Sequence, residues 1–370
     1  MKNKTSLLIT TINVPTFLDD IALLSKKKKI GIDCLIIGDK KTNPKIKQYL
    51  NKLSRNHSHI NIEYYDVQKQ KKILGKYKKF YEMMPYNSGV RKMLANLIAS
   101  TRSYKHNIMI DDDNYISKDF FDYHTIVGSR KKIKIIKTKS SYFNIYESLN
   151  EKNNLIFYPR GFPWSERFKK NNYTIKDQTV KIDLINGLVL KDPDIDAISR
   201  LFWPIDVLSV KKKFMPVFGL NKKSWTSFNN QNTSISKEVT DIYFTPPSTG
   251  RNADIWTSYF IYKVLEQLDS KVCFGRPIVK QIRNVHNLWT DLKDEMENNI
   301  LTDNFVELLR SIKLTKKTHL AVTEELINKC ILKIGKNPKK DRHHMIRNFF
   351  REYDTWINTV KYLKKTKTNL

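Results

Sequence analysis

The feature that most constrains the fold is a short apolar strand that runs directly into three consecutive aspartates. Asn107–Ile110 has the composition of a buried strand, and Asp111, Asp112 and Asp113 follow it without a spacer. In the preceding segment, Ser88–Arg102, apolar residues recur at helical spacing. A helix, a strand and an acidic turn in this order are typical of an open α/β sheet, whose ligand sites lie at the carboxyl ends of the strands.

The rest of the first half also alternates between strand-like and helix-like segments, which favours a parallel sheet covered by helices. After a middle region of mixed Gly, Pro, Asn and aromatic residues, roughly 140–250, a helix and a closing strand follow. The expected strands are Leu7–Ile12, Ile32–Ile37, Asn61–Tyr65 and Val272–Val279, and the expected helices are Thr16–Lys29 and Ile255–Leu268.

The length of 370 residues, with 40% hydrophobic residues, suits one large α/β domain or two domains. We expect a catalytic domain over residues 1–295 and a basic helical region over 296–370. In the last expected helix, Met345–Leu363, an apolar and aromatic stripe is flanked by basic residues. Packing onto the catalytic domain is its first expected role, and docking on an anionic membrane is the alternative.

The formal net charge of +30 allows anionic partners: nucleic acid, a membrane surface or a phosphorylated small molecule. A diffuse charge from a Lys-rich composition explains it equally well. Binding of nucleic acid would need a basic face with interleaved aromatics, so we rank it last.

Cys34, Cys273 and Cys330 lie too far apart for a disulfide framework or a CxxC zinc site, which favours a reducing compartment. The first residues begin like a signal peptide, but threonines break the apolar stretch, so we expect a strand there. No run approaches the roughly 18–20 apolar residues of a spanning helix. We expect a cytoplasmic protein, with a peripheral position on the inner face of a membrane as an option.

Three adjacent carboxylates repel one another unless a cation or a ring of donors compensates. In an extended turn Asp111 and Asp113 point to the same side, and hard oxygen ligands suit Mn²⁺ or Mg²⁺. A calcium loop and a solvated hairpin are the alternatives, while an EF-hand is excluded because its later ligands and glycine are missing.

Seven short motifs occur in an order that resembles nucleotide-sugar enzymes of the GT-A fold. The two similar groups are the STELLO-type glycosyltransferases and the reversibly glycosylated polypeptide, or UDP-arabinopyranose mutase, family. The resemblance spans Leu8 to about Glu295 and implies a Rossmann-like α/β domain that binds a nucleotide-diphosphate sugar. Besides the opening Ile9-Thr-Thr-Ile12, the motifs are Ile37-Gly-Asp39, Tyr86-Asn-Ser-Gly-Val-Arg-Lys92, Ile110-Asp-Asp-Asp-Asn114, Tyr158-Pro-Arg-Gly-Phe-Pro163, Asn186-Gly-Leu188 with Pro193-Asp-Ile-Asp-Ala197, Phe228-Asn-Asn-Gln-Asn-Thr233 and Gly250-Arg-Asn-Ala-Asp-Ile-Trp256.

The resemblance implies a role for each matched position. Thr11 and Asp39 would hold the nucleoside, with a plain turn aspartate as the alternative for Asp39. Arg91 and Lys92 would face the diphosphate, although a solvated helix face fits Lys92 nearly as well. The remaining implied donor contacts are Asp112, Arg167 and Asn232, and the implied metal ligands are Asp111 and Asp113.

Asp254 is the expected catalytic carboxylate. It opens the helix that runs to Leu268, where the helix dipole stabilises an anion, and simple N-capping is the alternative. An inverting transferase needs a base that takes the proton of the acceptor as an oxocarbenium-like centre forms. Trp256 would contact a sugar or belong to the core.

Two positions depart from the mutase pattern. Ala253 stands where that family has an aspartate, and Gln281 stands where it has a histidine; His286 is a candidate third metal ligand, with a surface histidine as the alternative. One segment agrees with the mutase pattern. The segment that carries the self-glycosylated arginine of the mutases is matched here by Phe162-Pro-Trp-Ser-Glu-Arg167.

The expected function is therefore metal-dependent transfer of a sugar from a nucleotide-diphosphate donor, with a UDP-sugar as the expected donor. The acceptor would be the hydroxyl of a glycan or of a lipid-linked molecule, in glycan or surface polysaccharide synthesis. A nucleotide-sugar mutase is the second interpretation, and an inactive nucleotide-sugar-binding scaffold is the third.

Overall fold

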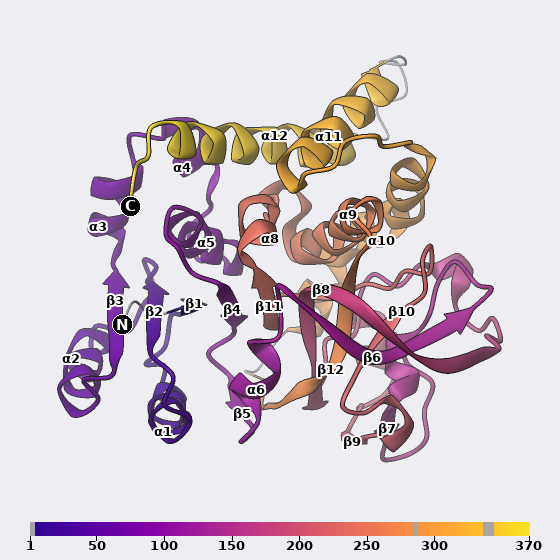
Figure 1. Ribbon diagram of the computed structural model, residues 1–370, viewed down its shortest axis with the longest axis horizontal. Helices are drawn as coiled ribbons and strands as arrows, with labels where there is room; N and C mark the ends of the chain where they lie inside the picture. Colours follow the sequence, from indigo (N-terminus) through magenta and orange to yellow (C-terminus); the bar gives the residue numbers. More distant parts are fainter. Residues whose placement is uncertain (1–3, 284–286, 336–343) are drawn as a thin grey trace.

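The computed structural model describes residues 4–283, 287–335 and 344–370. Its sheet begins with four parallel strands in the order β3 (Ile60–Tyr65), β2 (Ile32–Ile37), β1 (Thr5–Thr10) and β4 (His106–Ile110) (Figure 1). Helices separate the consecutive strands of this half along the chain, as parallel pairing requires. The carboxyl ends of β1, β2 and β4 therefore meet at one edge of the sheet.

Beyond β4 the sheet becomes mixed. Its next strands are β11 (Asn232–Ser236), β8 (Tyr173–Lys191), β6 (Ser129–Thr138), β10 (Val217–Leu220), β12 (Ser270–Gln281) and β5 (Asn114–Ile116). β11 is antiparallel to both β4 and β8, whereas β12 runs parallel to β8. The short strands β7 (Leu149–Glu151) and β9 (Val207–Val210) pair with each other beside β8.

Helices cover both faces of the parallel half because the strand residues alternate between two cores. Leu7 and Ile9 lie in the core beneath α1 and α2, while Leu8 belongs to the larger core with α5, α8 and α9. The helices through this region are α1 (Leu18–Lys28), α2 (Ile46–Asn56), α3 (Val67–Leu74), α4 (Lys78–Met83), α5 (Lys92–Ser100), α6 (Phe120–His124), α7 (Ala197–Phe202), α8 (Lys237–Ile242) and α9 (Ala253–Gln267).

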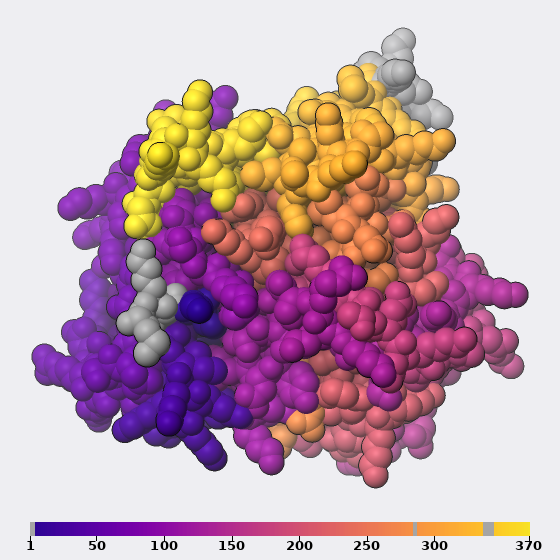
Figure 2. Space-filling model, viewed as in Figure 1, coloured from indigo at the N-terminus to yellow at the C-terminus, as the bar shows by residue number. Residues whose placement is uncertain are grey.

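The C-terminal helices share the larger core. They are α10 (Leu288–Ser311), α11 (His319–Gly335) and α12 (His344–Lys365), and they cap one side of the molecule in orange and yellow (Figure 2). Trp256 of α9 stacks on Phe305 of α10 with ring centroids 4.4 Å apart, which makes Trp256 a core residue. The expected boundary after residue 295 falls inside α10.

The apolar stripe of α12 faces the protein. Phe349, Tyr353, Trp356 and Val360 are all fully buried, and the indole of Trp356 donates to the carbonyl of Asp241 at 2.8 Å. The stripe therefore has the packing role that was expected first. Within the described part of the chain, no helix combines the length and apolar character needed to cross a membrane.

The structure confirms the predicted α/β class with its helical C-terminal part. Cys34, Cys273 and Cys330 are buried free thiols, as their spacing indicated. The long β6–β8 pairing, which joins Ser129–Thr138 to Tyr173–Ile182, was not among the expected features.

Candidate functional site

The acidic turn lies where β4 ends, beside the end of β1. The hydroxyl of Thr11 donates to the carboxylate of Asp112. Lys92, at the start of α5, donates through its ammonium group to Asp111 and, at 3.2 Å, to the carbonyl of Asn230. The Lys92 side chain is only 1% exposed, so the alternative of a solvated helix face for this residue is wrong.

Asp113 is the least compensated carboxylate of the turn. Its Oδ2 accepts from Nε2 of Gln281 at 2.9 Å, while its buried Oδ1 has no hydrogen-bond partner among the described residues. Burial, followed by repulsion from Asp111, raises the pKa of Asp113 to about 6. Burial is also the main cause that raises the pKa of Asp112.

These features fit a divalent cation that is bound partly by the protein and partly by the phosphates of a substrate. An uncompensated buried carboxylate oxygen needs a positive partner, and Mg²⁺-type sites commonly use one or two carboxylates together with substrate phosphates. Among the described residues, no group of three or more His, Cys, Asp or Glu side chains is placed to hold a metal ion. His286, the candidate third ligand, lies outside the described residues.

Asp39 lies at the end of β2 in a ring of donors. Its carboxylate accepts from the backbone N–H groups of Lys40 at 2.7 Å and Asn87 at 2.6 Å. Nε of Arg91 lies 3.8 Å from it, and the same guanidinium donates to the carbonyl of Met84 at 3.1 Å. The fully buried Arg91 therefore lies behind Asp39, where it supports the carboxylate from within the protein.

Asp254 occupies the second position of α9. The N-cap is Asn252, which makes no side-chain capping bond, so the alternative of Asp254 as a simple N-cap is wrong. Its Oδ1 lies 3.4 Å from Nη2 of Arg160, and its Oδ2 accepts from the N–H of Asn230 at 3.4 Å. Burial raises the pKa of Asp254, and the neighbouring Arg160 opposes that rise.

The backbone of one residue, Asn230, joins the acidic turn to Asp254. The carbonyl of Asn230 accepts from Lys92, which also binds Asp111, and the N–H of Asn230 donates to Asp254. Two segments of the chain that are more than a hundred residues apart thus place their carboxylates around the backbone of one residue, with the Lys92 ammonium between Asn230 and Asp111. The structure brings Thr11, Asp111–Asp113 and Asp254 into one site.

A buried ion pair supports Asp254, and the sequence reasoning assigned it no role. Nη2 of Arg160 lies 2.8 Å from Oδ2 of Asp194, and Arg160 also donates to the carbonyl of Arg251, just before α9. The ion pair lowers the pKa of Asp194 strongly, against its burial. Both residues lie in motifs that carry the resemblance, which is the only sequence signal that pointed to them.

Two residues that were expected to contact the donor, Arg167 and Asn232, bind other parts of the protein instead. Nη2 of Arg167 lies 2.6 Å from Oδ2 of Asp196, and its guanidinium lies 3.8 Å from the ring centre of Trp164. Asn232 is fully buried, with Nδ2 donating to the carbonyl of Pro277 at 3.1 Å and Oδ1 2.9 Å from Nε2 of His124. Asn232 thus holds strands together.

The departures from the mutase pattern fall directly on this site. Ala253 is buried at the first position of α9. Gln281 donates an amide N–H to Asp113, and its Oε1 accepts from Nε2 of Gln231 at 3.0 Å. An amide donor therefore lies beside the acidic turn, at the sequence position where the resemblance led us to compare Gln281 with a histidine.

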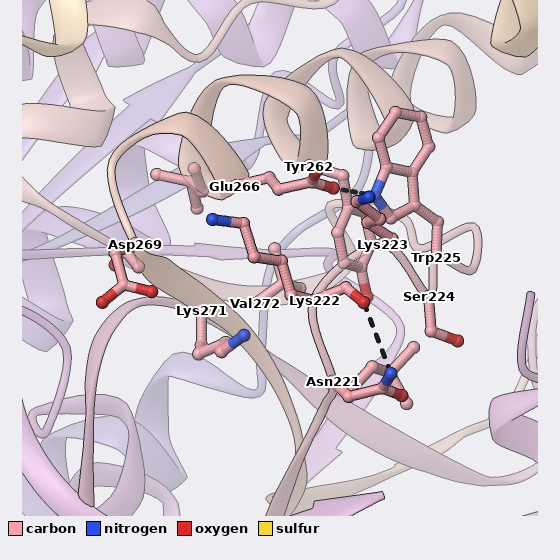
Figure 3. A pocket seen from close by; sticks show the side chains of 13 residues that line it. Asn221, Lys222, Lys223, Ser224, Trp225, Tyr262, Glu266, Asp269, Lys271 and Val272 are labelled. Atoms are coloured by element: carbon pink, nitrogen blue, oxygen red, sulfur yellow. Dashed lines mark hydrogen bonds between the residues drawn. The ribbon is translucent and has the colours of Figure 1, made fainter. Parts of the chain in front are cut away.

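A separate pocket next to Trp225 is too small for a nucleotide (Figure 3). Its volume is about 20 Å³, close to that of a single water site. The indole of Trp225 donates to Glu266 at 2.9 Å across it. This pocket belongs to the packing of α9 against β12.

No protein-family model matches the chain, and no curated protein matches it in sequence. Among solved structures, it is similar to two crystal structures of S. aureus TarS, each with a TM-score of 0.34. One covers 97% of this chain at 10% identity, and this chain spans 55% of its length. The other, of residues 1–349, covers 98% of this chain and 92% of its own length at 12% identity. At this TM-score the likeness carries no argument, so fold and function rest on the topology and the site of this chain.

Proposed function

We propose that this protein is a metal-dependent glycosyltransferase that moves a sugar from a nucleotide-diphosphate donor, a UDP-sugar in the first instance, to an acceptor hydroxyl of a glycan. The observation that carries the proposal is the backbone of Asn230: its N–H binds the buried carboxylate of Asp254, and its carbonyl binds Lys92, the partner of Asp111 in the acidic turn. Together with the motif order, this arrangement fits a donor site next to a general base.

The donor side is formed by the ends of β1 and β2. Thr11 and Asp39 lie there with hydrogen-bonding groups suited to a base or ribose, while Asp111 and Asp113 lie next to them. A divalent cation bound at these two carboxylates would offset the charge of the diphosphate and stabilise the leaving group. Asp112 is held by Thr11 and shapes the turn.

Asp254 would act on the acceptor. A base in an inverting transfer must hold a carboxylate ready for the acceptor proton, and a raised pKa makes it a stronger base than an ordinary aspartate. The N–H of Asn230 and the guanidinium of Arg160 fix its orientation. The Arg160–Asp194 pair in turn fixes Arg160, so the base is positioned before the acceptor arrives.

A donor screen tests this proposal. UDP-, GDP-, CMP- and dTDP-sugars are added to the protein with and without Mn²⁺, and the unfolding temperature is measured. One donor class should raise it, and the rise should require Mn²⁺, because a ligand that binds only the folded state stabilises it. No stabilisation by any of the four would contradict the proposal.

A further inference from the structure

A cavity of about 1010 Å³ opens beside the candidate site, between β5, the end of β8 and the end of β12. Gln281 lines this cavity and also donates to Asp113. Arg283, another lining residue, donates to Oε1 of Gln281 at 3.2 Å. The cavity is thus separated from the acidic turn by a single side chain.

The lining has a marked apolar part. Tyr115 on β5 is 51% exposed, and Ile282, just after β12, is 66% exposed. They are joined in the lining by Ile116, Leu190 and Ile278. Large apolar side chains gathered in an open cavity cost free energy in water, which an apolar ligand would recover.

The cavity lining also carries five basic residues; in the described structure three of them are paired with acidic residues and two lysines are not. Arg276 pairs with Asp119, Arg283 with Asp192 and Lys191 with Asp206. Lys118 and Lys280 line the same cavity, and neither is in an ion pair within the described ranges. Two exposed ammonium groups beside apolar side chains suit an anionic group attached to an aliphatic chain.

We infer that this cavity, the β5–β12 groove, binds the acceptor, and that the acceptor carries a phosphate next to an aliphatic chain. The inference rests on the proposed function, because only a transferase needs an acceptor site next to its donor site. The chain would lie along Tyr115 and Ile282, and the phosphate would bind Lys118 and Lys280. The donor would enter from the other side of the acidic turn, at Thr11 and Asp39.

Three probes separate the parts of this recognition. Decyl phosphate has both the chain and the anion, decyl maltoside has the same chain without charge, and glycerol phosphate has the anion without the chain. Calorimetric titration below the micellar concentration should show decyl phosphate binding at least about tenfold more tightly than either control, because glycerol phosphate lacks the CH₂ groups that leave water and decyl maltoside lacks the charge-assisted hydrogen bonds. Near-ultraviolet circular dichroism checks that the protein stays folded.

Matched variants locate the binding. Lys118→Gln combined with Lys280→Gln should weaken decyl phosphate binding about tenfold, since both lose a charge-assisted hydrogen bond. Lys131→Gln combined with Lys176→Gln, two exposed lysines on β6 and β8, should leave it unchanged. Tyr115→Ser should weaken it severalfold, whereas Leu332→Ser should not, although Leu332 on α11 is the more exposed of the two, at 65% against 51%.

Equal binding of decyl maltoside would reduce the groove to an apolar patch, and equal binding of glycerol phosphate would reduce it to a phosphate site; either result overturns the inference. An equal loss in the β6–β8 lysine pair would show diffuse attraction and also overturn it. Donor binding is measured on the same variants and should be unchanged. If the wild-type protein binds no donor, the proposed function is refuted, whatever the titrations with decyl phosphate show.

Discussion

Replacing Asp113 with asparagine should make the protein more stable at pH 7 while removing its donor site. The carboxylate of Asp113 is largely buried, lies next to Asp111, and has one oxygen without a hydrogen-bond partner in the described structure. Asparagine keeps an oxygen for the amide of Gln281 and removes the charge. A residue that destabilises the fold is expected where binding requires it.

The magnitude follows from the pKa. Folding raises the pKa of Asp113 from 3.8 to about 6, which corresponds to about 3 kcal/mol at most. Solvent contact at the turn reduces this to about 1–2 kcal/mol. Because the folded-state pKa is the higher one, the cost is complete above pH 6 and disappears as the pH falls towards 4, where the folded protein is protonated.

Urea unfolding of wild type and Asp113→Asn in EDTA, at pH 7 and at pH 4.5, measures this difference. We expect a gain of about 1–2 kcal/mol at pH 7 and about a third of that gain at pH 4.5, which is still above the unfolded pKa of 3.8. Asp111→Asn is the matched control: it leaves the buried ammonium of Lys92 without its carboxylate and should destabilise by about 1–3 kcal/mol. A loss of stability in Asp113→Asn, or a gain that does not change with pH, would show that the ionised carboxylate of Asp113 does not destabilise the fold.

Three further predictions concern the base, the C-terminal helices and the mutase alternative. Asp254→Asn should bind donor normally but turn over at least roughly a hundredfold more slowly; unchanged turnover would exclude it as the base. Trp356→Ala should lower the free energy of unfolding by about 3–5 kcal/mol, because a fully buried ring is lost from the shared core. Urea unfolding measures this loss, and a loss below about 1 kcal/mol would show that α12 is not part of that core. Incubation with labelled donor and no acceptor should give no stoichiometric label on Arg167, whose guanidinium is paired with Asp196; mass spectrometry that finds such a label would favour the mutase.

Much of the parallel half could be predicted because its strands are short apolar runs. Ile32–Ile37 forms β2 with the expected bounds, and α9 begins within two residues of the expected start. The β6–β8 pairing was not predictable because β6 is rich in lysine and its partner lies about forty residues away. Its stability comes from tertiary packing, which periodicity does not report.

The acidic turn and Asp254 could be selected from the sequence, but their connection could not. Asn230 acts through its backbone N–H and carbonyl, so the identity of its side chain carries no signal. The burial of Lys92 was equally hidden, because a lysine on a helix is ordinarily solvated. Ion pairs such as Arg160–Asp194 depend on how distant segments fold together.

Binding of the donor diphosphate at the acidic turn is the step on which the proposed function depends, and it can be measured by calorimetric titration of Asp113→Asn. The donor class found in the screen is titrated in Mn²⁺ into wild type, Asp113→Asn and Asp177→Asn, an exposed aspartate on β8. We predict equal affinity for wild type and Asp177→Asn, and at least about tenfold weaker binding for Asp113→Asn although it is more stable. Equal donor affinity in all three proteins would contradict binding of the donor at the acidic turn.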